Sequence, residues 1–276
     1  MTVLREAVAD GSIGGRLWVY LNYHCNLQCA YCLTDSSPLV ARRELPVERL
    51  PELAAEALEA GFTSLGITGG EPFLVPGLPE ALEATVALLP TLLLTNVSLF
   101  TAKLLKRLKP LAKFDFAVQL SLDSAHPDVN DEMRAPRNFA KVVAAIGHLR
   151  ASGIRVRIAT TSDDMDPAAL AELCELHRSL GIPDSDHVVR PIIRRGRAAD
   201  RELGMAVSRA DLPAELTITA DGAFWSPFGP TVSRGRLDTD LLITRATRPL
   251  AIPAAAMLRL ARGGGEYAAP RRALVR

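Results

Sequence analysis

The sequence has 276 residues, of which 48% are hydrophobic, and its formal net charge at pH 7 is +1. This length suits one large domain or one domain with an appendage, and the near-zero charge argues against a protein whose main partner is nucleic acid. No apolar run approaches the roughly 20 residues needed to span a bilayer. Residues 1–15 carry Glu6 and Asp10 and lack the apolar segment of a signal peptide, so we expect a soluble, cytoplasmic protein without a membrane partner.

Short apolar runs alternate with longer amphipathic segments along most of the chain. Runs of strand-forming residues and apolar residues at helical spacing predict six strands separated by helices. The predicted strands are residues 17–22, 62–68, 92–95, 116–122, 154–160 and 187–193, and the predicted helices are residues 47–60, 78–89, 102–108, 139–152 and 168–180. This alternation is typical of βαβ units with a parallel sheet. We therefore predict an α/β fold built as a partial (β/α)6 TIM-like barrel.

The sequence changes character after about residue 196. Residues 215–225 (ELTITADGAFW) predict a β-hairpin around Asp221-Gly222. The last part of the chain is rich in alanine and arginine, which predicts a solvated tail or a contact for an acidic partner. The predicted organisation is a lead-in (residues 1–14), the barrel (15–198), a small hairpin-containing extension (199–244) and a basic, partly disordered tail (245–276).

Polar residues follow the first four predicted strands directly. In barrels of this kind the active site gathers at the C-terminal ends of the strands. We therefore expect the site there, although strand ends are also polar simply because they meet water. The residues in question are a cysteine cluster, Gly69-Gly70-Glu71-Pro72, Thr95-Asn96 and Ser121-Leu122-Asp123-Ser124.

Three of the four cysteines lie in the segment CNLQCAYC, as Cys25, Cys29 and Cys32. In a reducing cytoplasm such a cluster holds a metal or does redox chemistry more often than it forms disulfides. A structural zinc site normally has four protein ligands. A [4Fe-4S] cluster on three cysteines fits better, because one iron stays free for a ligand. Cys174 lies on a helical face with apolar neighbours, and we interpret it as an inert core thiol.

The segment CNLQCAYC resembles the C-x3-C-x-aromatic-C signature of the radical S-adenosylmethionine (radical SAM) superfamily. Gly69 to Pro72 resemble the second motif of that family, and the resemblance covers roughly residues 16–198. It implies one [4Fe-4S] cluster held by Cys25, Cys29 and Cys32, with the remaining iron bound to the methionine part of SAM.

The resemblance also implies which residues contact SAM. Tyr31 would pack near the adenine, and the GGEP segment would recognise the methionine amino group, with a carboxylate to anchor this positive group. The family often has Asn-Gly after the third strand, and here Val97 replaces the glycine. The implied cofactor-binding residues are Tyr31, Gly69, Gly70, Glu71, Pro72, Asn96, Ser121 and Asp123, the last two as contacts of the SAM ribose.

Two further segments resemble the branch of the family with a SPASM or twitch extension. They are residues 119–134 (QLSLDSAHPDVNDEMR) and Arg195-Gly196-Arg197-Ala198. Such extensions normally supply cysteines for auxiliary clusters. Here no cysteine follows Cys174, and Ser226 stands where one is expected. We therefore expect a single cluster and a degenerate or purely structural extension.

The function implied is reductive cleavage of SAM to a 5′-deoxyadenosyl radical, which abstracts a hydrogen atom from a peptide or a small metabolite. An electron donor such as flavodoxin or ferredoxin is implied as a partner. Only about 15 residues precede the first strand, so a separate protein would supply peptide recognition. The alternative is a non-catalytic scaffold that binds an iron–sulfur cluster or zinc. No catalytic acid or base is identified.

Overall fold

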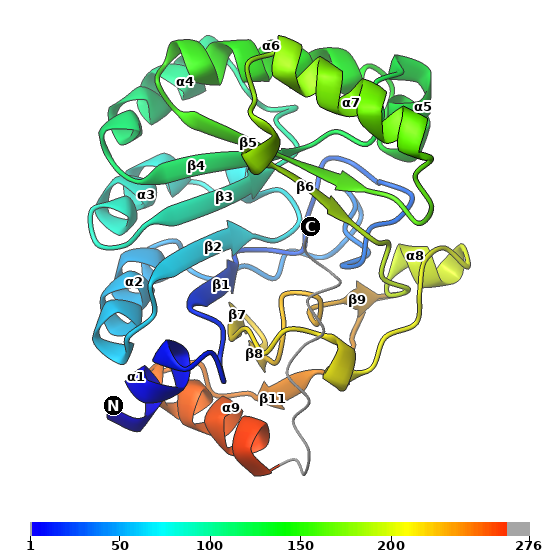
Figure 1. Ribbon diagram of the computed structural model, residues 1–276. Coiled ribbons are helices and arrows are strands. Elements are labelled where there is room, and N and C mark those ends of the chain that lie inside the picture. Colours follow the sequence, from blue (N-terminus) through cyan, green and yellow to red (C-terminus); the bar gives the residue numbers. More distant parts are fainter. Residues whose placement is uncertain (1, 264–276) are drawn as a thin grey trace.

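The fold is built on one curved sheet of nine strands, in the order β11-β8-β7-β1-β2-β3-β4-β5-β6 (Figure 1). The computed structural model describes residues 2–263. Strands β1 to β6 are all parallel to their neighbours. They are β1 (Arg16–Tyr20), β2 (Ser64–Thr68), β3 (Thr91–Thr95), β4 (Phe116–Ser121), β5 (Arg155–Thr161) and β6 (His187–Arg190).

Helices between these strands cover the outer face of the sheet (Figure 1). They are α2 (Arg49–Ala60), α3 (Leu78–Val86), α4 (Ala102–Leu108), α6 (Asn138–Ala151) and α7 (Pro167–Ser179). In α2, Leu50, Leu53, Ala54 and Ala57 recur at helical spacing and are fully buried, whereas Leu58 is exposed. The predicted α/β fold and partial (β/α)6 barrel are therefore confirmed.

The element boundaries follow local chemistry. Helix α2 ends at Gly61, whose φ of 94° is a left-handed conformation that glycine adopts without strain. Strand β6 ends at Arg190, three residues earlier than predicted, because Pro191 has no N–H to continue the ladder. None of the helices within residues 2–263 is long and apolar enough to cross a membrane.

The predicted hairpin exists, and it continues the barrel sheet. Strands β7 (Thr217–Thr219) and β8 (Gly222–Phe224) pair antiparallel around Asp221. Strand β7 also pairs parallel with β1, and β11 (Leu242–Thr244) pairs antiparallel with β8. The extension thus lengthens the sheet beyond β1 and brings its own residues to the inner side of the curve. A separate two-stranded ribbon joins β9 (Val232–Ser233) to β10 (Arg236–Leu237).

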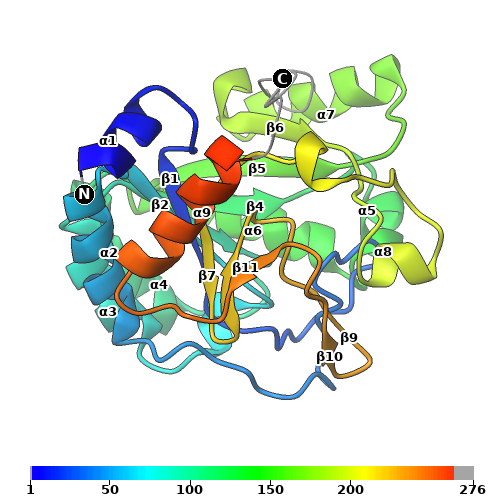
Figure 2. The same cartoon turned by 90° about the horizontal axis from the view of Figure 1, so that it is seen from below.

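Two terminal helices and two short ones were absent from the sequence prediction. Helix α1 (Thr2–Ala9) lies in the predicted lead-in and packs beside α9 (Ala251–Gly263), as both views show (Figures 1 and 2). Helix α5 (Pro127–Met133) and helix α8 (Arg197–Asp200) follow β4 and β6.

The prediction of a solvated tail was wrong for α9. Leu250, Ala254 and Met257 are buried in the hydrophobic core, and burying a leucine or methionine side chain stabilises a fold by about 1.5–3 kcal/mol. The sequence suggested a tail because alanine and arginine dominate its composition. Residues 264–276 lie outside the described residues.

Candidate functional site

A cavity of about 760 Å³ lies inside the curve of the sheet, within the usual size range of ligand-binding pockets. Its walls come from β1, the cysteine segment, the ends of β2 to β6, and the extension. The residues that close it on the extension side are Asp211, Leu212, Pro213, Glu215, Pro227 and Phe228. The extension therefore completes a cavity that six parallel strands leave open.

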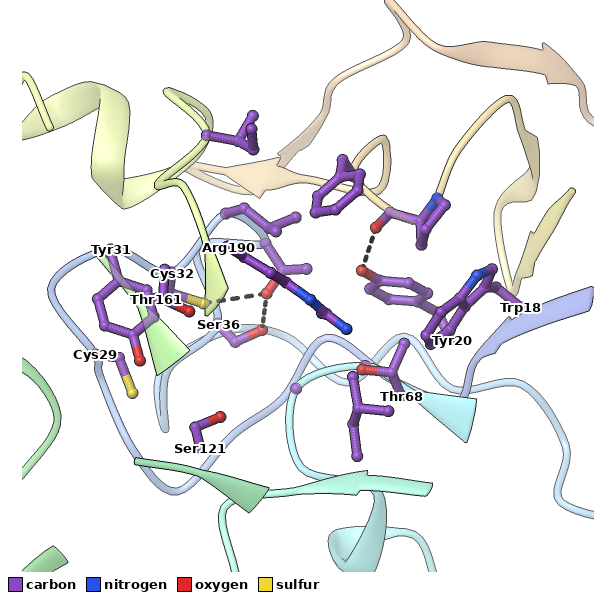
Figure 3. Close-up of a pocket in the computed structure, with 18 of the residues that line it drawn as sticks. Trp18, Tyr20, Cys29, Tyr31, Cys32, Ser36, Thr68, Ser121, Thr161 and Arg190 are labelled. Atoms are coloured by element: carbon purple, nitrogen blue, oxygen red, sulfur yellow. Dashed lines mark hydrogen bonds between the residues drawn. The ribbon is translucent and has the colours of Figure 1, made fainter. Parts of the chain in front are cut away.

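The three clustered cysteines all line this cavity, and all carry free thiols. Figure 3 shows Cys29 and Cys32 beside Tyr31 at one end of it. Cys25 is only 7% exposed, and burial is the main cause that raises its thiol pKa to about 12. Burial also raises the pKa of Cys29. Thiolates in this environment require a cationic partner, which the irons of a cluster provide.

The donor set at the cavity wall suits a [4Fe-4S] cluster. Three free thiols line it, and as thiolates they can bind three irons and leave the fourth iron free for another ligand. A structural zinc site normally has four protein ligands. The Sγ of Cys32 also lies 3.2 Å from the Thr34 hydroxyl, a contact of the kind that tunes cluster potentials.

Arg197, the arginine of the Gly-Arg-Ala segment, fixes the backbone of the cysteine segment by hydrogen bonds. Arg197 donates to the backbone carbonyl oxygens of Cys29 and Ser36, each at 2.8 Å, and pairs with Asp35 at 3.0 Å. Gly196 fits because a Cβ there would lie 2.4 Å from the carbonyl oxygen of Leu33. The segment that ends the barrel core is therefore a clamp on the segment that presents the thiols.

The GGEP segment is joined to the same loop by backbone hydrogen bonds. Gly70 N donates to Asn22 O at 2.9 Å, and Glu71 N donates to His24 O at 2.9 Å. A Cβ on Gly70 would lie 2.1 Å from His24 O, so no other residue fits without displacing backbone. Gly69 and Gly70 both line the cavity. The close approach that these glycines permit is to the cysteine loop itself.

Of the predicted SAM contacts in the GGEP segment, Gly69 and Gly70 line the cavity, whereas Glu71 and Pro72 lie just outside its lining. The Glu71 carboxylate is fully buried and accepts hydrogen bonds from Thr95 Oγ1 at 2.8 Å, Asn96 N at 2.8 Å and Phe73 N at 3.0 Å. Burial raises its pKa, and these hydrogen bonds oppose that effect. Both carboxylate oxygens therefore have protein donors, and Glu71 joins the ends of β2 and β3.

Asn96 lines the cavity next to the cysteines. Its Nδ2 donates to Asn26 Oδ1 at 3.0 Å and lies 3.5 Å from Cys25 Sγ. The following residue, Val97, has a φ of 54°, a left-handed conformation that strains a β-branched side chain. The backbone therefore takes the conformation suited to the glycine that resembling proteins carry there.

Tyr31, Asp123 and Arg134 form one buried network at the cavity wall, where Tyr31 and Arg134 line the cavity and Asp123 does not. The Tyr31 hydroxyl donates to Asp123 Oδ2 at 2.5 Å and accepts from Arg134, while Asp123 Oδ1 accepts from Thr161 N at 2.9 Å. Of the two residues predicted to contact the SAM ribose, Ser121 lines the cavity and Asp123 lies behind it. Asn130 supports the network by accepting from Asp123 N at 3.1 Å.

Cys174 is half-buried, less enclosed than the core thiol that the sequence predicted. It lies on α7, away from the clustered cysteines in sequence, with its Sγ 3.7 Å from Nδ1 of His187. It does not line the cavity. The structure thus separates it from the candidate cluster site.

Several cavity residues were missed from the sequence. Arg16, Trp18 and Tyr20 alternate along β1, and Arg157 and Arg190 come from β5 and β6. An arginine inside an otherwise apolar strand was the available signal, because alternate residues of a barrel strand face its interior.

Comparisons with known proteins identify the family of the chain. The sequence model of the Radical SAM superfamily matches residues 19–166, more than half of the chain. The bacteriocin subtilosin biosynthesis protein AlbA of Bacillus subtilis is 31% identical over 163 residues, which are 58% of this chain and 36% of AlbA. The mycofactocin maturase MftC of Mycobacterium tuberculosis is 31% identical over 58% of this chain and 41% of its own length. A GTP 3′,8-cyclase of Rhizobium leguminosarum is 27% identical over 74% of this chain and 62% of the cyclase.

The fold likewise matches solved structures. SuiB of Streptococcus suis, crystallised with its precursor peptide SuiA, superposes with a TM-score of 0.59 at 20% identity, over 76% of this chain and 47% of SuiB. The chain spans less than two thirds of the length of each relative named above. Members of the matched superfamily use a [4Fe-4S] cluster and SAM. From the sequence match, the cysteine segment at the cavity and the shared barrel, the chain belongs to the radical SAM superfamily.

Proposed function

We propose that this protein is a radical SAM enzyme that binds one [4Fe-4S] cluster through Cys25, Cys29 and Cys32 and modifies a peptide or a small metabolite. When bound, the cluster and SAM supply reductive carbon–sulfur bond cleavage to a 5′-deoxyadenosyl radical, which removes a hydrogen atom from substrate. The single observation that carries the proposal is that all three thiols of the cysteine segment line one large cavity of a radical SAM fold.

The residues of the chain contribute binding, orientation and exclusion of water. Arg197 and the GGEP backbone hold the cysteine loop from two sides. Gly69, Gly70, Asn96 and Ser121 line the cavity close to this loop, and we assign them to SAM binding. Tyr31 also lines it, whereas Glu71 and Asp123 act as positioning residues, because protein donors occupy their carboxylates. The apolar residues of the extension shield the radical from solvent.

The relatives support two substrate classes. AlbA is a bacteriocin biosynthesis protein and MftC a maturase, which favours a peptide as substrate. The GTP 3′,8-cyclase favours a small molecule. Flavodoxin or ferredoxin would deliver the electron, and a separate recognition protein would present a peptide. The four-part division of the chain, with a degenerate SPASM or twitch-like extension, belongs to the same proposal.

The test is anaerobic reconstitution with iron and sulfide, followed by dithionite and SAM and detection of 5′-deoxyadenosine by mass spectrometry. We expect product together with about four irons per chain. Four irons without product would instead support the non-catalytic scaffold. Zinc in place of iron would contradict the assignment of the cysteines.

A further inference from the structure

The cavity has a second polar region, built from residues of three strands and the extension. Arg16 begins β1, whereas the cysteine segment follows the end of that strand. Residues 16 and 20 are separated by about 13 Å along an extended strand. Arg157, Arg190 and Glu215 line the same cavity. The three arginines come from the inward-facing positions of β1, β5 and β6 and thus share the interior of the barrel.

Arg190 has no hydrogen-bond or ion-pair partner for its guanidinium among residues 2–263. Figure 3 shows its side chain extended across the cavity, between Cys32 and Tyr20. The Tyr20 hydroxyl is already used, since it donates to the carbonyl oxygen of Pro227 at 2.5 Å. A guanidinium presents five donors in a planar fork. At Arg190 this fork is directed into open cavity space.

The other two arginines are only weakly paired. Arg157 Nε lies 3.7 Å from Asp186 Oδ1 and has no hydrogen-bond partner in the described part of the chain, because Asp186 is held by Arg155 at 2.5 Å. Arg16 Nε donates to Ser64 Oγ at 3.3 Å, and its guanidinium lies 5.4 Å from the Trp18 ring centroid. Among residues 2–263, neither arginine has a carboxylate closer than 3.7 Å to its guanidinium.

One carboxylate of the cavity wall, Glu215, lies near two of these arginines. Glu215 accepts from Trp18 Nε1 at 2.6 Å and lies close enough to Arg16 and Arg190 to affect their pKa values. Asp211, the other carboxylate of this wall, is exposed and bonded to Ser208. Burial lowers the pKa of Arg190, and Arg157 and Arg16 lower it further, while Glu215 raises it. Uncompensated charge in a partly dry cavity is unfavourable until an anion enters.

We propose that Arg190, together with Arg157 and Arg16, binds an anionic group of the substrate, a phosphate or a carboxylate. This proposal rests on the proposed function, since it places the substrate in the cavity that holds the cluster and SAM. A planar guanidinium fork matches the oxygens of either group in bidentate geometry. The substrate would be anchored at its charged end and would present its reacting carbon toward the cysteine end of the cavity.

The test measures binding of three small probes to the reconstituted full-length protein saturated with SAM. Phenyl phosphate, benzoate and the neutral benzamide share a ring and differ in the group that the arginines would meet. We expect calorimetry to detect at least one anion and not benzamide. Arg190→Gln should weaken anion binding about tenfold or more, the effect of losing one charged hydrogen-bonded pair. The matched control is Arg259→Gln, which removes an exposed arginine of α9 and should leave affinity unchanged. The preferred anion identifies the group as phosphate or carboxylate.

Further measurements on the same samples separate this proposal from the enzyme assignment. Arg190→Gln should keep the wild-type iron content and SAM affinity, and the control Arg259→Gln should keep substrate-free SAM cleavage as well. The melting temperature of Arg190→Gln should not fall, because the change removes a charge without an ion-pair partner among residues 2–263, and the rise in melting temperature caused by the anion should disappear. Equal anion affinity in wild type and Arg190→Gln overturns the proposal, as does failure of both anions to bind wild type. Loss of SAM affinity in this variant also overturns it, because the arginine would then serve the SAM carboxylate. A wild-type protein without cluster or SAM cleavage would contradict the enzyme assignment, whatever the anions do.

Discussion

Arg197 donates a hydrogen bond to the carbonyl oxygen of Cys29 at 2.8 Å, across 168 residues of sequence. The same guanidinium reaches Ser36 O and Asp35, so a single side chain holds both sides of the cysteine segment. Ligand geometry at a cluster depends on such outer contacts, which orient the ligands without touching the irons.

Arg197→Lys should therefore weaken cluster retention. Lysine keeps the charge but has no planar fork, so at least one buried carbonyl oxygen loses its donor, at a cost of about 1–3 kcal/mol in unfolding free energy. We expect faster iron release to a chelator and a lower urea midpoint than in wild type. Arg201→Lys, at an exposed position one turn later, is the control. Equal iron release from both variants would contradict the clamp.

Cys29→Ala should abolish cluster assembly, because each of the three thiolates is proposed to bind a different iron. Cys174→Ala removes a thiol that lies outside the cavity and should leave iron content unchanged. The measurement is iron per chain after anaerobic reconstitution. A full iron complement in Cys29→Ala, or a loss of about four irons in Cys174→Ala, would show that the ligands are misassigned.

Gly70→Ala should displace the cysteine loop, because the added Cβ would lie 2.1 Å from His24 O and 2.5 Å from His24 C. Neither atom belongs to a flexible side chain, so we expect a loss of about 2–4 kcal/mol in unfolding free energy together with reduced iron binding. Gly147→Ala is the matched control. Nothing lies within 4 Å of its Cβ on α6, and alanine there should stabilise the helix by about 0.5–1 kcal/mol. The unfolding free energies of both variants, measured with denaturant, test this prediction.

Tyr31→Phe should weaken the buried network that joins the cysteine segment to the end of β4. Removing the hydroxyl leaves Asp123 and Arg134 without their shared partner, at a cost of about 1–3 kcal/mol. If Tyr31 only packed in its loop, phenylalanine would be neutral. A double-mutant cycle with Asp123→Asn gives the coupling energy, and a value near zero would refute the network as a stabilising unit.

His177 should make stability fall in acid. Burial, reinforced by His187 at a ring-centroid distance of 4.4 Å, lowers its pKa to about 4 from an ordinary 6.5. The unfolded chain therefore takes up a proton more readily, so this contribution to stability is complete above pH 6.5 and is lost as the pH falls toward 4. His187 acts in the same direction, because burial lowers its pKa too.

Replacing His177 with leucine should accordingly reduce the difference between unfolding free energies at pH 7 and pH 4.5 by about 2 kcal/mol. His148→Gln, on the exposed side of α6, should keep the wild-type pH dependence. Urea unfolding at the two pH values provides the comparison. If the difference between the unfolding free energies at pH 7 and pH 4.5 is the same in His177→Leu as in wild type, the pKa of His177 is not lowered by folding.

The local pattern of apolar and polar residues was sufficient to predict most strands and helices of the barrel. Helix α4 spans the predicted residues, and the glycines at 61, 153 and 181, which follow α2, α6 and α7, all have positive φ. Helix α9 was missed because its composition is that of a tail, while its burial depends on a core formed by distant segments. The short helix α5 was missed because its polar residues make contacts beyond its own turn, as Asp131 does in accepting from Phe139 N at 2.7 Å.

The order of residues was enough to identify the alternating strands and helices, the three thiols and the family, since each depends on spacing over a few residues. The roles of individual carboxylates and arginines were decided by folding. Glu71 and Asp123 occur in recognisable motifs, yet donors from Thr95, Asn96, Tyr31 and Thr161 occupy their oxygens. Arg16, Arg157 and Arg190 lie far apart in sequence, and the curve of the sheet brings them to one cavity. Whether a polar group has a hydrogen-bond partner, or a charge has a counter-charge, depends on which residues lie beside it in the folded chain. Residue order alone does not give these spatial neighbours.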